Sequence, residues 1–397
     1  MHIVLYDNPR RQRFYPLTLT RAVADLRLGI FTLKERWQHI TKQQVFILTD
    51  PVLQPLYPLI PSGDCLYIDA AVLPAEQLCT QVLNLNPDSY LVDHDEIVAI
   101  RTETGFSPAD QISQAASSAK SFNVSSQKWL QYPFQLFQWN DEFTRFDFFL
   151  ITKDRVSQAL SSFIQTANAR DIFVEAGASI APGCILNAST GPIYIGKDVT
   201  IMEGCMLRGP IALGEGTTVK MGAKIYGATT TGAGCVLGGE IKNVVFLSNS
   251  NKAHDGYLGD SVIGEWCNLG AGTSNSNVKN TAGEVKQWNY FESSFISAGN
   301  KCGVIMGDYS KTAINSSINT GTVVGVCSNL FGAGLTAKVI PDFSWGMDGR
   351  TRYQYDKALT DIGNWKKMKN KIVTEPEAKM LKHIFDGSEA YTSKGKK

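Results

Sequence analysis

The sequence lacks an excess of charge of either sign. Lysine and arginine number 38, aspartate and glutamate number 37, and the formal net charge is +1. A protein that binds nucleic acid or an anionic membrane through its overall electrostatic field carries a basic excess, so neither partner is expected. Any binding of anions must depend on local clusters of basic side chains.

Long apolar runs and paired cysteines are also missing. No apolar run approaches the ~20 residues that a membrane span needs. The chain begins on the strand-like MHIVLYD, without the segments of a signal peptide, so a cytoplasmic protein is expected. The eight cysteines stand singly, with no CxxC pair and no histidine at zinc spacing, which argues against a disulfide framework and a structural zinc site.

The second half of the sequence has a six-residue repeat of aliphatic residues, in which a small residue often falls four places later. A period of six does not fit an α-helix, but it fits a chain that turns a corner after each short strand. The repeat therefore predicts a parallel β-helix over residues 171–340, with the repeated side chains inside. An antiparallel sandwich with coincidental spacing is the alternative. The positions in phase are Val174, Ile180, Leu186; Ile195, Ile201, Leu207, Leu213, Val219, Ile225, Thr231, Leu237; Tyr257, Ile263, Leu269; and Met306, Thr312, Ile318, Val324, Leu330.

The rest of the chain divides into three parts. Residues 1–115 alternate strand-like runs such as HIVLY and QVFILT with helical segments such as LKERWQHI, which predicts an α/β, Rossmann-like domain. Residues 116–170 are expected to link and dock this domain onto the β-helix, with an exposed Ser-, Ala- and Gln-rich connection at 107–128. Residues 341–397 form a C-terminal tail in which TEPEAKMLKHIF predicts a short amphipathic helix.

The six-residue step stops at residues 242–256 and 275–301. Because irregular segments on a rigid scaffold often carry function, these interruptions are where a site is expected. Five polar residues in and between them are candidates: Lys242, His254, Tyr257, Asn268 and Asn277.

In order and spacing, these five residues resemble the acetyltransferase domain of the bifunctional N-acetylglucosamine-1-phosphate uridyltransferase/glucosamine-1-phosphate acetyltransferase family. Lys242 precedes His254 by 12 residues, and Tyr257, Asn268 and Asn277 follow it by 3, 14 and 23. The resemblance implies left-handed coils, a homotrimer, and acetyl-CoA as the co-substrate.

The resemblance also implies roles. His254 is the expected general base, which takes a proton from the amino group of glucosamine 1-phosphate. Lys242 and Tyr257 hold the sugar phosphate, and Asn268 and Asn277 orient the sugar and the acetyl group. For the asparagines, the left-handed conformation required at β-helix corners is a rival explanation. An arginine of the family falls on Lys224, and Arg208 is an alternative for its role.

The N-terminal domain has a basic cluster just after its first strand, where ligands of open α/β sheets bind. Arg10, Arg11, Arg13, Arg21 and Arg27 lie there. Within it, RFYPLT resembles the end of the nucleotide-binding loop of sugar-1-phosphate nucleotidyltransferases, which implies that Arg10, Arg11, Arg13 and Arg21 contact nucleotide phosphates. The sequence departs from that pattern, because NPRRQ at residues 8–12 replaces the family's glycines and Ala22 and Val23 replace its Pro-Lys.

By the same resemblance, Asp69 in YIDAAVLP corresponds to the family's magnesium-binding aspartate. The substrates are then UTP or another nucleoside triphosphate, a sugar 1-phosphate and acetyl-CoA, and the function is a bifunctional transferase in UDP-N-acetylglucosamine synthesis. Two alternatives remain open. The protein is a nucleotidyltransferase whose β-helix only assembles a trimer, or it is a non-enzymatic trimeric scaffold.

Overall fold

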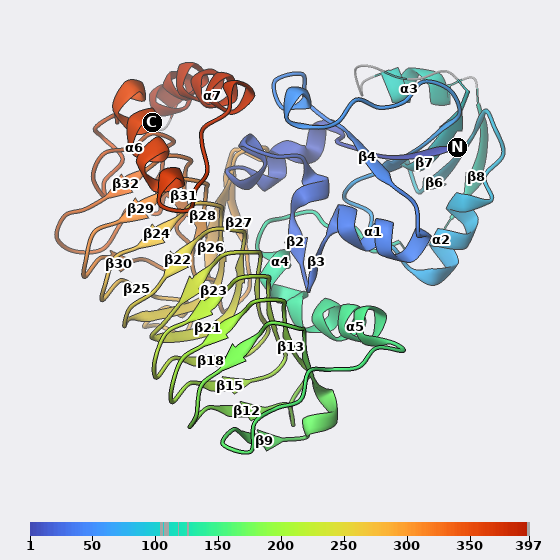
Figure 1. The fold of residues 1–397 in the computed structure, drawn as a ribbon. Helices are drawn as coiled ribbons and strands as arrows, with labels where there is room; N and C mark the ends of the chain where they lie inside the picture. The colour runs from blue at the N-terminus through green and yellow to red at the C-terminus, as the bar shows by residue number, and fades with distance from the viewer. Residues whose placement is uncertain (104–105, 107–110, 118, 125–126, 395–397) are drawn as a thin grey trace.

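The computed structural model of the protein describes residues 1–103, 106, 111–117, 119–124 and 127–394. An α/β domain lies beside a long parallel β-helix, and two C-terminal helices cover the last coils of the β-helix (Figure 1). The predicted fold class is confirmed, and the three-sided coils are consistent with the left-handed form. Within the described part of the chain, no helix is long and apolar enough to cross a membrane.

The α/β domain is built on one mixed sheet. Its strands, in spatial order, are β4 (Val45–Leu48), β1 (His2–Tyr6), β5 (Cys65–Asp69), β7 (Glu96–Thr102), β6 (Ser89–Asp93) and β8 (Lys120–Asn123). Strands β4, β1 and β5 run parallel, so their carboxyl ends meet at one edge of the sheet. Strand β7 is antiparallel to both its neighbours. The sheet includes β8, which lies beyond residue 115.

Five helices accompany this sheet: α1 (Leu33–Thr41), α2 (Glu76–Leu83), α3 (Gln111–Ala116), α4 (Gln135–Gln138) and α5 (Asn140–Thr152). Helix α1 begins with a capping box, in which Thr32 and Glu35 each accept from the other's backbone N–H. A short hairpin, β2 (Arg27–Leu28) and β3 (Phe31–Thr32), precedes it. Of the expected connection 107–128, the described residues lie in or beside α3 and β8, and residues 107–110, 118 and 125–126 lie outside the described part.

The β-helix has three faces. The first face packs toward α4 and α5 and carries β10 (Ile172–Val174), β13 (Ile193–Ile195), β16 (Ile211–Leu213), β19 (Thr229–Thr231), β28 (Ile305–Met306), β31 (Val323–Val324) and β33 (Val339–Ile340). The second carries β11 (Ser179–Ile180), β14 (Thr200–Ile201), β17 (Thr218–Val219), β20 (Val236–Leu237), β22 (Asn251–Lys252), β24 (Asn268–Leu269), β29 (Lys311–Thr312) and β32 (Asn329–Leu330). The third carries β9 (Gln165–Ala167), β12 (Ile185–Asn187), β15 (Met206–Arg208), β18 (Lys224–Tyr226), β25 (Ser274–Asn275) and β30 (Ser317–Ile318).

Two longer strands, β21 (Glu240–Phe246) and β23 (Tyr257–Ile263), run round the corner from the third face to the first. The coils here are shorter than the regular 18 residues, since Leu237 pairs with Lys252 and Glu240 with Tyr257. The six-residue step therefore slips by one residue. Tyr257, expected inside the prism, points outward, and the fully buried Leu258 takes the inner position.

The two predicted interruptions of the repeat differ in structure. Residues 242–256 are not an irregular insertion, because they continue the prism through β21 and β22 in a shortened coil. Residues 275–301 do contain an insertion, built on the antiparallel hairpin β26 (Lys286–Asn289) and β27 (Ser294–Ser297). The insertion contacts the α/β domain, since Val285, Ala298 and Cys302, which flank the hairpin, belong to the hydrophobic core of that domain.

The C-terminal tail forms two helices, α6 (Tyr355–Lys367) and α7 (Glu375–Lys394), where one short helix was expected. They pack on the corner between the first and second faces of the last coils, against Trp266 and Tyr309. A buried ion pair between Lys366 and Glu377 joins the two helices. Residues 395–397 lie outside the described part.

A second buried ion pair docks α5 onto the α/β domain. Both side chains, Arg36 of α1 and Asp147 of α5, are fully buried. The guanidinium donates to both carboxylate oxygens at 2.8 Å, and the backbone N–H groups of Ile30 and Phe31 also donate to Asp147. Asn140, at the start of α5, accepts from Gly29 and donates to Ala228 of the β-helix, so α5 connects the two domains.

Replacing Arg36 with methionine is expected to destabilise the protein by about 3–5 kcal/mol, because it leaves the buried Asp147 carboxylate without a cation. Urea denaturation followed by fluorescence measures the effect. Lys379→Met is the matched control: it removes an exposed pair with Glu375 on α7 and should leave the urea midpoint close to that of the wild type. Equal effects of the two substitutions would show that the buried pair does not stabilise the docking.

Candidate active sites

The first candidate site lies at the carboxyl ends of β1 and β5. The 3-10 helix η1 (Pro9–Phe14) follows β1, and the Asn8 side chain caps it by accepting from the N–H of Arg10 at 2.7 Å. None of residues 8–14 has a positive φ, so the backbone of this segment does not require glycine. Arg10, Arg11 and Arg13 project from η1 around a cavity that Asp69, at the end of β5, also lines.

Two buried carboxyl groups lie in this cavity. Burial raises the pKa of Asp69 to about 7 although the N–H of Ala71 and the amide of Asn8 both donate to it. Burial also raises the pKa of Asp7 to about 6, against the opposing effects of Arg11 and of a hydrogen bond from Thr49. In both cases loss of solvation outweighs the favourable neighbours. The positive charge around the cavity is therefore not enough to offset the cost of burying these two carboxylates.

Each arginine of the cavity has an acidic partner. Arg10 pairs with Glu96 of β7 and lies 5.5 Å from the centre of the Trp129 ring. Arg11 lies 3.4 Å from Asp7 and donates to the carbonyl of Thr18, which braces the loop. These contacts leave a cavity of about 20 Å³, room for about one water molecule. A nucleotide would therefore have to bind across its mouth and take over some of the arginine contacts.

Arg13 is held from the β-helix. Glu292, in the turn between β26 and β27, binds its guanidinium at 2.9 Å, and Asn289 donates to its carbonyl at the same distance. The guanidinium also lies over the rings of Phe291 and Tyr132. The insertion of the β-helix thus positions one of the arginines of the N-terminal cavity.

Arg21 is not brought to this cavity. It is buried in the contact between the domains, where it pairs with Asp308 and lies 3.5 Å from Glu265 of the β-helix. Arg27 also lies elsewhere, since it pairs with Glu35 of α1. The arginine cluster of the sequence therefore separates into a group at the cavity and residues that hold the loop in place.

A magnesium ion commonly takes one or two carboxylates of a protein and completes its shell with water and substrate phosphates. Asp69 fits that pattern, since it is a cavity-lining carboxyl whose nearest cation, Arg10, is 3.9 Å away. Within the described part of the chain, no three histidine, cysteine or acidic side chains cluster in a way that could hold a metal by themselves. A cation here would depend on the phosphates of a bound nucleotide.

The second candidate site lies at the corner between the second and third faces, at residues 253–256, which we call the His254 corner. The His254 side chain is exposed, and it makes no hydrogen bond with the described residues. Asn268 lies on the second face, one coil further on, in register with Asn251, three residues before His254, and it accepts from the Asn251 side chain. Tyr257 begins the third face on the other side of the corner.

On the third face, Tyr257 is fixed by its neighbours. The side-chain amide of Asn277 donates to the Tyr257 hydroxyl at 3.1 Å and also to Asp260, which accepts from Asn243 at 2.7 Å. Burial raises the pKa of Tyr257 to about 12, with a smaller contribution from Asp260, so the phenol keeps its proton and remains a donor. Lys242 lies in register with Gly259 on the adjoining coil.

Lys224 and Arg208 lie in different columns of the third face. Lys224 is in register with Glu240 and, one coil later, with Tyr257. Arg208 is in register with Tyr226 and then with Lys242. Because adjacent strands are about 4.8 Å apart, Lys224 is about two strand spacings from Tyr257, whereas Arg208 is one coil further away. Lys224 is therefore the nearer of the two to the His254 corner.

Several residues of these sites are not evident from sequence motifs. Glu96, Trp129 and Glu292 come from segments far from the arginine loop, and no local pattern marks them. Lys252 lies where the six-residue step is lost, and its pairing with Leu237 in the shortened coil places this charged residue in a position that the repeat reserves for aliphatic side chains.

Comparison with known proteins bears on the first site. Residues 3–156 match the family model described as sugar nucleotidyl transferase. The match includes β1, η1 and β5, the elements that carry Arg10, Arg11, Arg13 and Asp69.

Relatives of known name are similar over a smaller part. The bifunctional protein GlmU of Methanocaldococcus jannaschii is 38% identical over 86 residues, which are 22% of this chain and 21% of that protein. A bifunctional sugar-1-phosphate nucleotidylyltransferase/acetyltransferase of Sulfurisphaera tokodaii is 35% identical over 92 residues, 23% of each chain. The matches thus span about a fifth of the length of these relatives.

Among solved structures, the polySia-specific acetyltransferase NeuO aligns with 52% of this chain and 93% of its own, at 11% identity and a TM-score of 0.27.

The raised pKa of Asp69 predicts how stability varies with pH in the absence of ligands. The folded protein holds this proton more tightly than the unfolded chain, whose pKa is near 3.8, so the contribution of Asp69 to stability falls as pH rises from about 4 to about 7. As pH rises across that range, the free energy of unfolding of Asp69→Asn should increase by on the order of 2–4 kcal/mol relative to that of the wild type. Urea denaturation at pH 4.5, 6 and 7.5 measures the difference.

The exposed Asp95→Asn controls for the substitution itself. A stability difference between Asp69→Asn and wild type that did not change with pH would mean that Asp69 is not desolvated in solution.

Proposed function

We propose that the protein is a bifunctional transferase that makes UDP-N-acetylglucosamine, acetylating glucosamine 1-phosphate in the β-helix and transferring a uridylyl group in the α/β domain. The observation that carries the proposal is the N-terminal cavity, in which three arginines and a buried carboxyl meet inside the part of the chain that matches sugar nucleotidyl transferases. The second activity is supported by the arrangement of polar residues about the His254 corner and by the names of the bifunctional relatives.

In the proposed acetyl transfer, the amino nitrogen of glucosamine 1-phosphate attacks the thioester carbon of acetyl-CoA. His254 takes the proton from that nitrogen, the new amide bond forms, and the bond to sulfur breaks to release coenzyme A. Lys242 and the Tyr257 hydroxyl bind the sugar phosphate, with Lys224 as a further cation, and Asn268 and Asn277 orient the sugar and the acetyl group.

In the proposed uridylyl transfer, the phosphate oxygen of N-acetylglucosamine 1-phosphate attacks the α-phosphorus of UTP, and pyrophosphate leaves. Arg10 and Arg13 exchange their carboxylate partners for phosphate oxygens of the nucleotide. Arg11 keeps its contacts within the loop and stabilises the loop conformation. A magnesium ion held by Asp69 and the phosphates would supply neutralising charge. Another nucleoside triphosphate would be bound by the same phosphate contacts.

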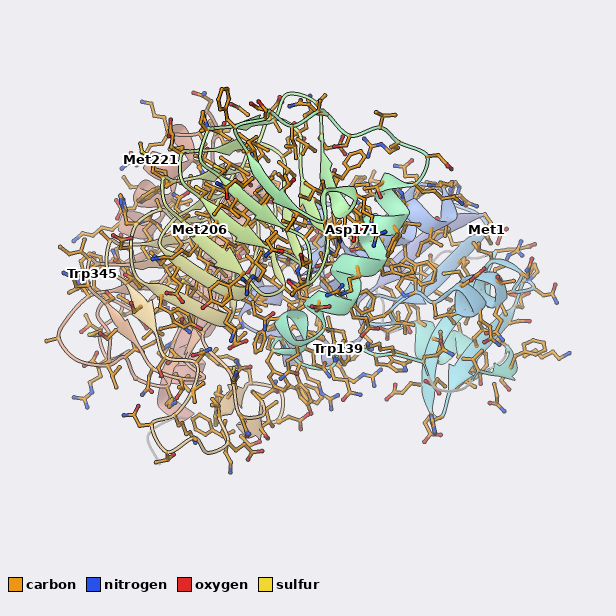
Figure 2. The ribbon with its side chains drawn as sticks, turned by 90° about the horizontal axis from the view of Figure 1, so that it is seen from below. Met1, Trp139, Asp171, Met206, Met221 and Trp345 are labelled. Atoms are coloured by element: carbon orange, nitrogen blue, oxygen red, sulfur yellow. The ribbon has the colours of Figure 1, made fainter. Side chains whose placement is uncertain are left out.

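We also propose that the protein works as a homotrimer. The His254 corner is open in one chain, and apolar side chains are exposed along the same edge of neighbouring coils: Met221 before it, and Ile314 and Phe331 after it. Figure 2 shows Met206 and Met221 on the part of the coils away from the α/β domain. A neighbouring copy that covers this edge would remove these side chains from water and enclose the acyl site.

His254→Ala is expected to lower kcat for acetyl transfer from acetyl-CoA to glucosamine 1-phosphate by at least ~100-fold, because it removes the imidazole that takes the proton in the proposed reaction. Coenzyme A release measures the rate. His383→Ala, at an exposed histidine of α7, is the control and should have no effect. Full acetyl transfer by His254→Ala would leave the β-helix with the role of an assembly scaffold.

Arg10→Ala is expected to lower kcat/KM for pyrophosphate release from UTP and N-acetylglucosamine 1-phosphate by ~10–100-fold, because a charge-assisted phosphate contact is lost. Acetyl transfer should not change, and Arg350→Ala, at an exposed arginine, serves as the control. If the wild-type protein released no pyrophosphate with any nucleoside triphosphate and magnesium, the N-terminal half of the proposal would fail.

A further inference from the structure

Lys252 occupies an interior position of the β-helix. It pairs in register with Leu237 of the preceding coil, and the residue that follows it in the same inward column of the second face is Leu269. The lysine is fully buried, like these leucines. An ammonium group inside an apolar prism is costly unless it is hydrogen-bonded, so its partners indicate why a lysine stands here.

The partners of Lys252 are the backbone carbonyls of the His254 corner. Its ammonium donates to the carbonyl oxygen of His254 and, at 3.1 Å, to that of Asp255. Within the described part of the chain it forms no ion pair with a carboxylate. Burial lowers its pKa to about 8, and Asp255 only partly opposes that shift. The lysine therefore serves the backbone of the corner and not a charged side chain.

The same corner is held from the adjoining coils. The N–H of Gly272 donates to the carbonyl of Asp255 at 2.9 Å. Gly239, which has a φ of +69°, lies so close beneath that a Cβ there would come 2.7 Å from the carbonyl oxygen of His254. The backbone of His254 and Asp255 is thus confined from one side by Gly239, from the other by Gly272 and from inside by Lys252.

We propose that Lys252 is a positioning residue for acetyl transfer, which fixes the backbone from which the His254 side chain projects. The inference rests on the proposed role of His254 as general base. A leucine could fill the same space but could not hydrogen-bond the two carbonyls, and the corner would then turn them toward water. A shift of about 1 Å in a proton acceptor is enough to slow a reaction by ~100-fold.

Lys252→Met tests the proposal, because methionine keeps the unbranched shape and removes the donors. We expect kcat for acetyl transfer to fall by ~10–100-fold, while KM for glucosamine 1-phosphate stays within about twofold and the melting temperature does not fall. Uridylyl transfer, measured on the same sample, should be unchanged. Leu269→Met, in the same column one coil later, is the matched control and should leave kcat unaltered.

Lys252→Gln separates the hydrogen bonds from packing and charge. The glutamine amide retains N–H donors, so Lys252→Gln should retain clearly more acetyl transfer than Lys252→Met. If Lys252→Met fails to fold, Lys252→Leu takes its place in the same comparison. Wild-type kcat in a folded Lys252→Met protein, or equal losses in the glutamine and the apolar variants, would overturn the proposal.

The two proposals fail differently. If His254→Ala retains acetyl transfer, the assignment of the general base is wrong, and the role of Lys252 is lost with it. If His254→Ala is inactive but Lys252→Met is fully active, the proposed function stands and only the positioning role is refuted.

Discussion

The parallel stacking of the coils is the constraint on which the rest of the structure depends. Each strand is hydrogen-bonded to the strand of the preceding coil in fixed register, as in the pairing of Met206 with Lys224 and of Lys224 with Glu240. Because side chains alternate between the inside and the outside of the prism, this register decides which residues meet on a face. The shortened coils around β21 and β23 turn Tyr257 outward and Lys252 inward, and both candidate roles follow from that slip.

The same β-helix also determines the shape of the N-terminal cavity. Asp308 accepts from Thr20 and Arg21, so the end of the arginine-rich loop is anchored in the contact between the domains. Closer to the cavity, Glu292 and Asn289 of the insertion hold Arg13. The loop that carries the proposed phosphate contacts is therefore fixed from both domains, and the α/β sheet alone does not determine where its arginines lie.

The sequence predicted the class of fold, because hexad periodicity and the alternation of strands with helices are local features, whereas both candidate sites remain predictions. The sequence could not predict the slip that placed Tyr257 outside, because nothing in the six-residue pattern shows that a coil is shortened between Leu237 and Tyr257. Arg21 illustrates a second limit. Its sequence neighbours are other arginines, whereas its partner Asp308 is 287 residues away and comes close only when the domains dock. Lys252 lies where the step is lost, so its inward position follows only from the pairing of Leu237 with Lys252 in the shortened coil.

The charges of the N-terminal cavity bear on how it would bind a nucleotide. Arg10, Arg11 and Arg13 are matched by the carboxylates of Glu96, Asp7 and Glu292, so they offer a triphosphate little net positive charge. A phosphate that displaced Glu96 or Glu292 would leave that carboxylate beside the new anion, and at short range like charges in a partly buried site repel strongly. The raised pKa of Asp69 points to the same deficit of positive charge. A divalent cation shared by Asp69 and the phosphates would correct it, so the proposed uridylyl transfer should depend on the metal for binding as well as for chemistry.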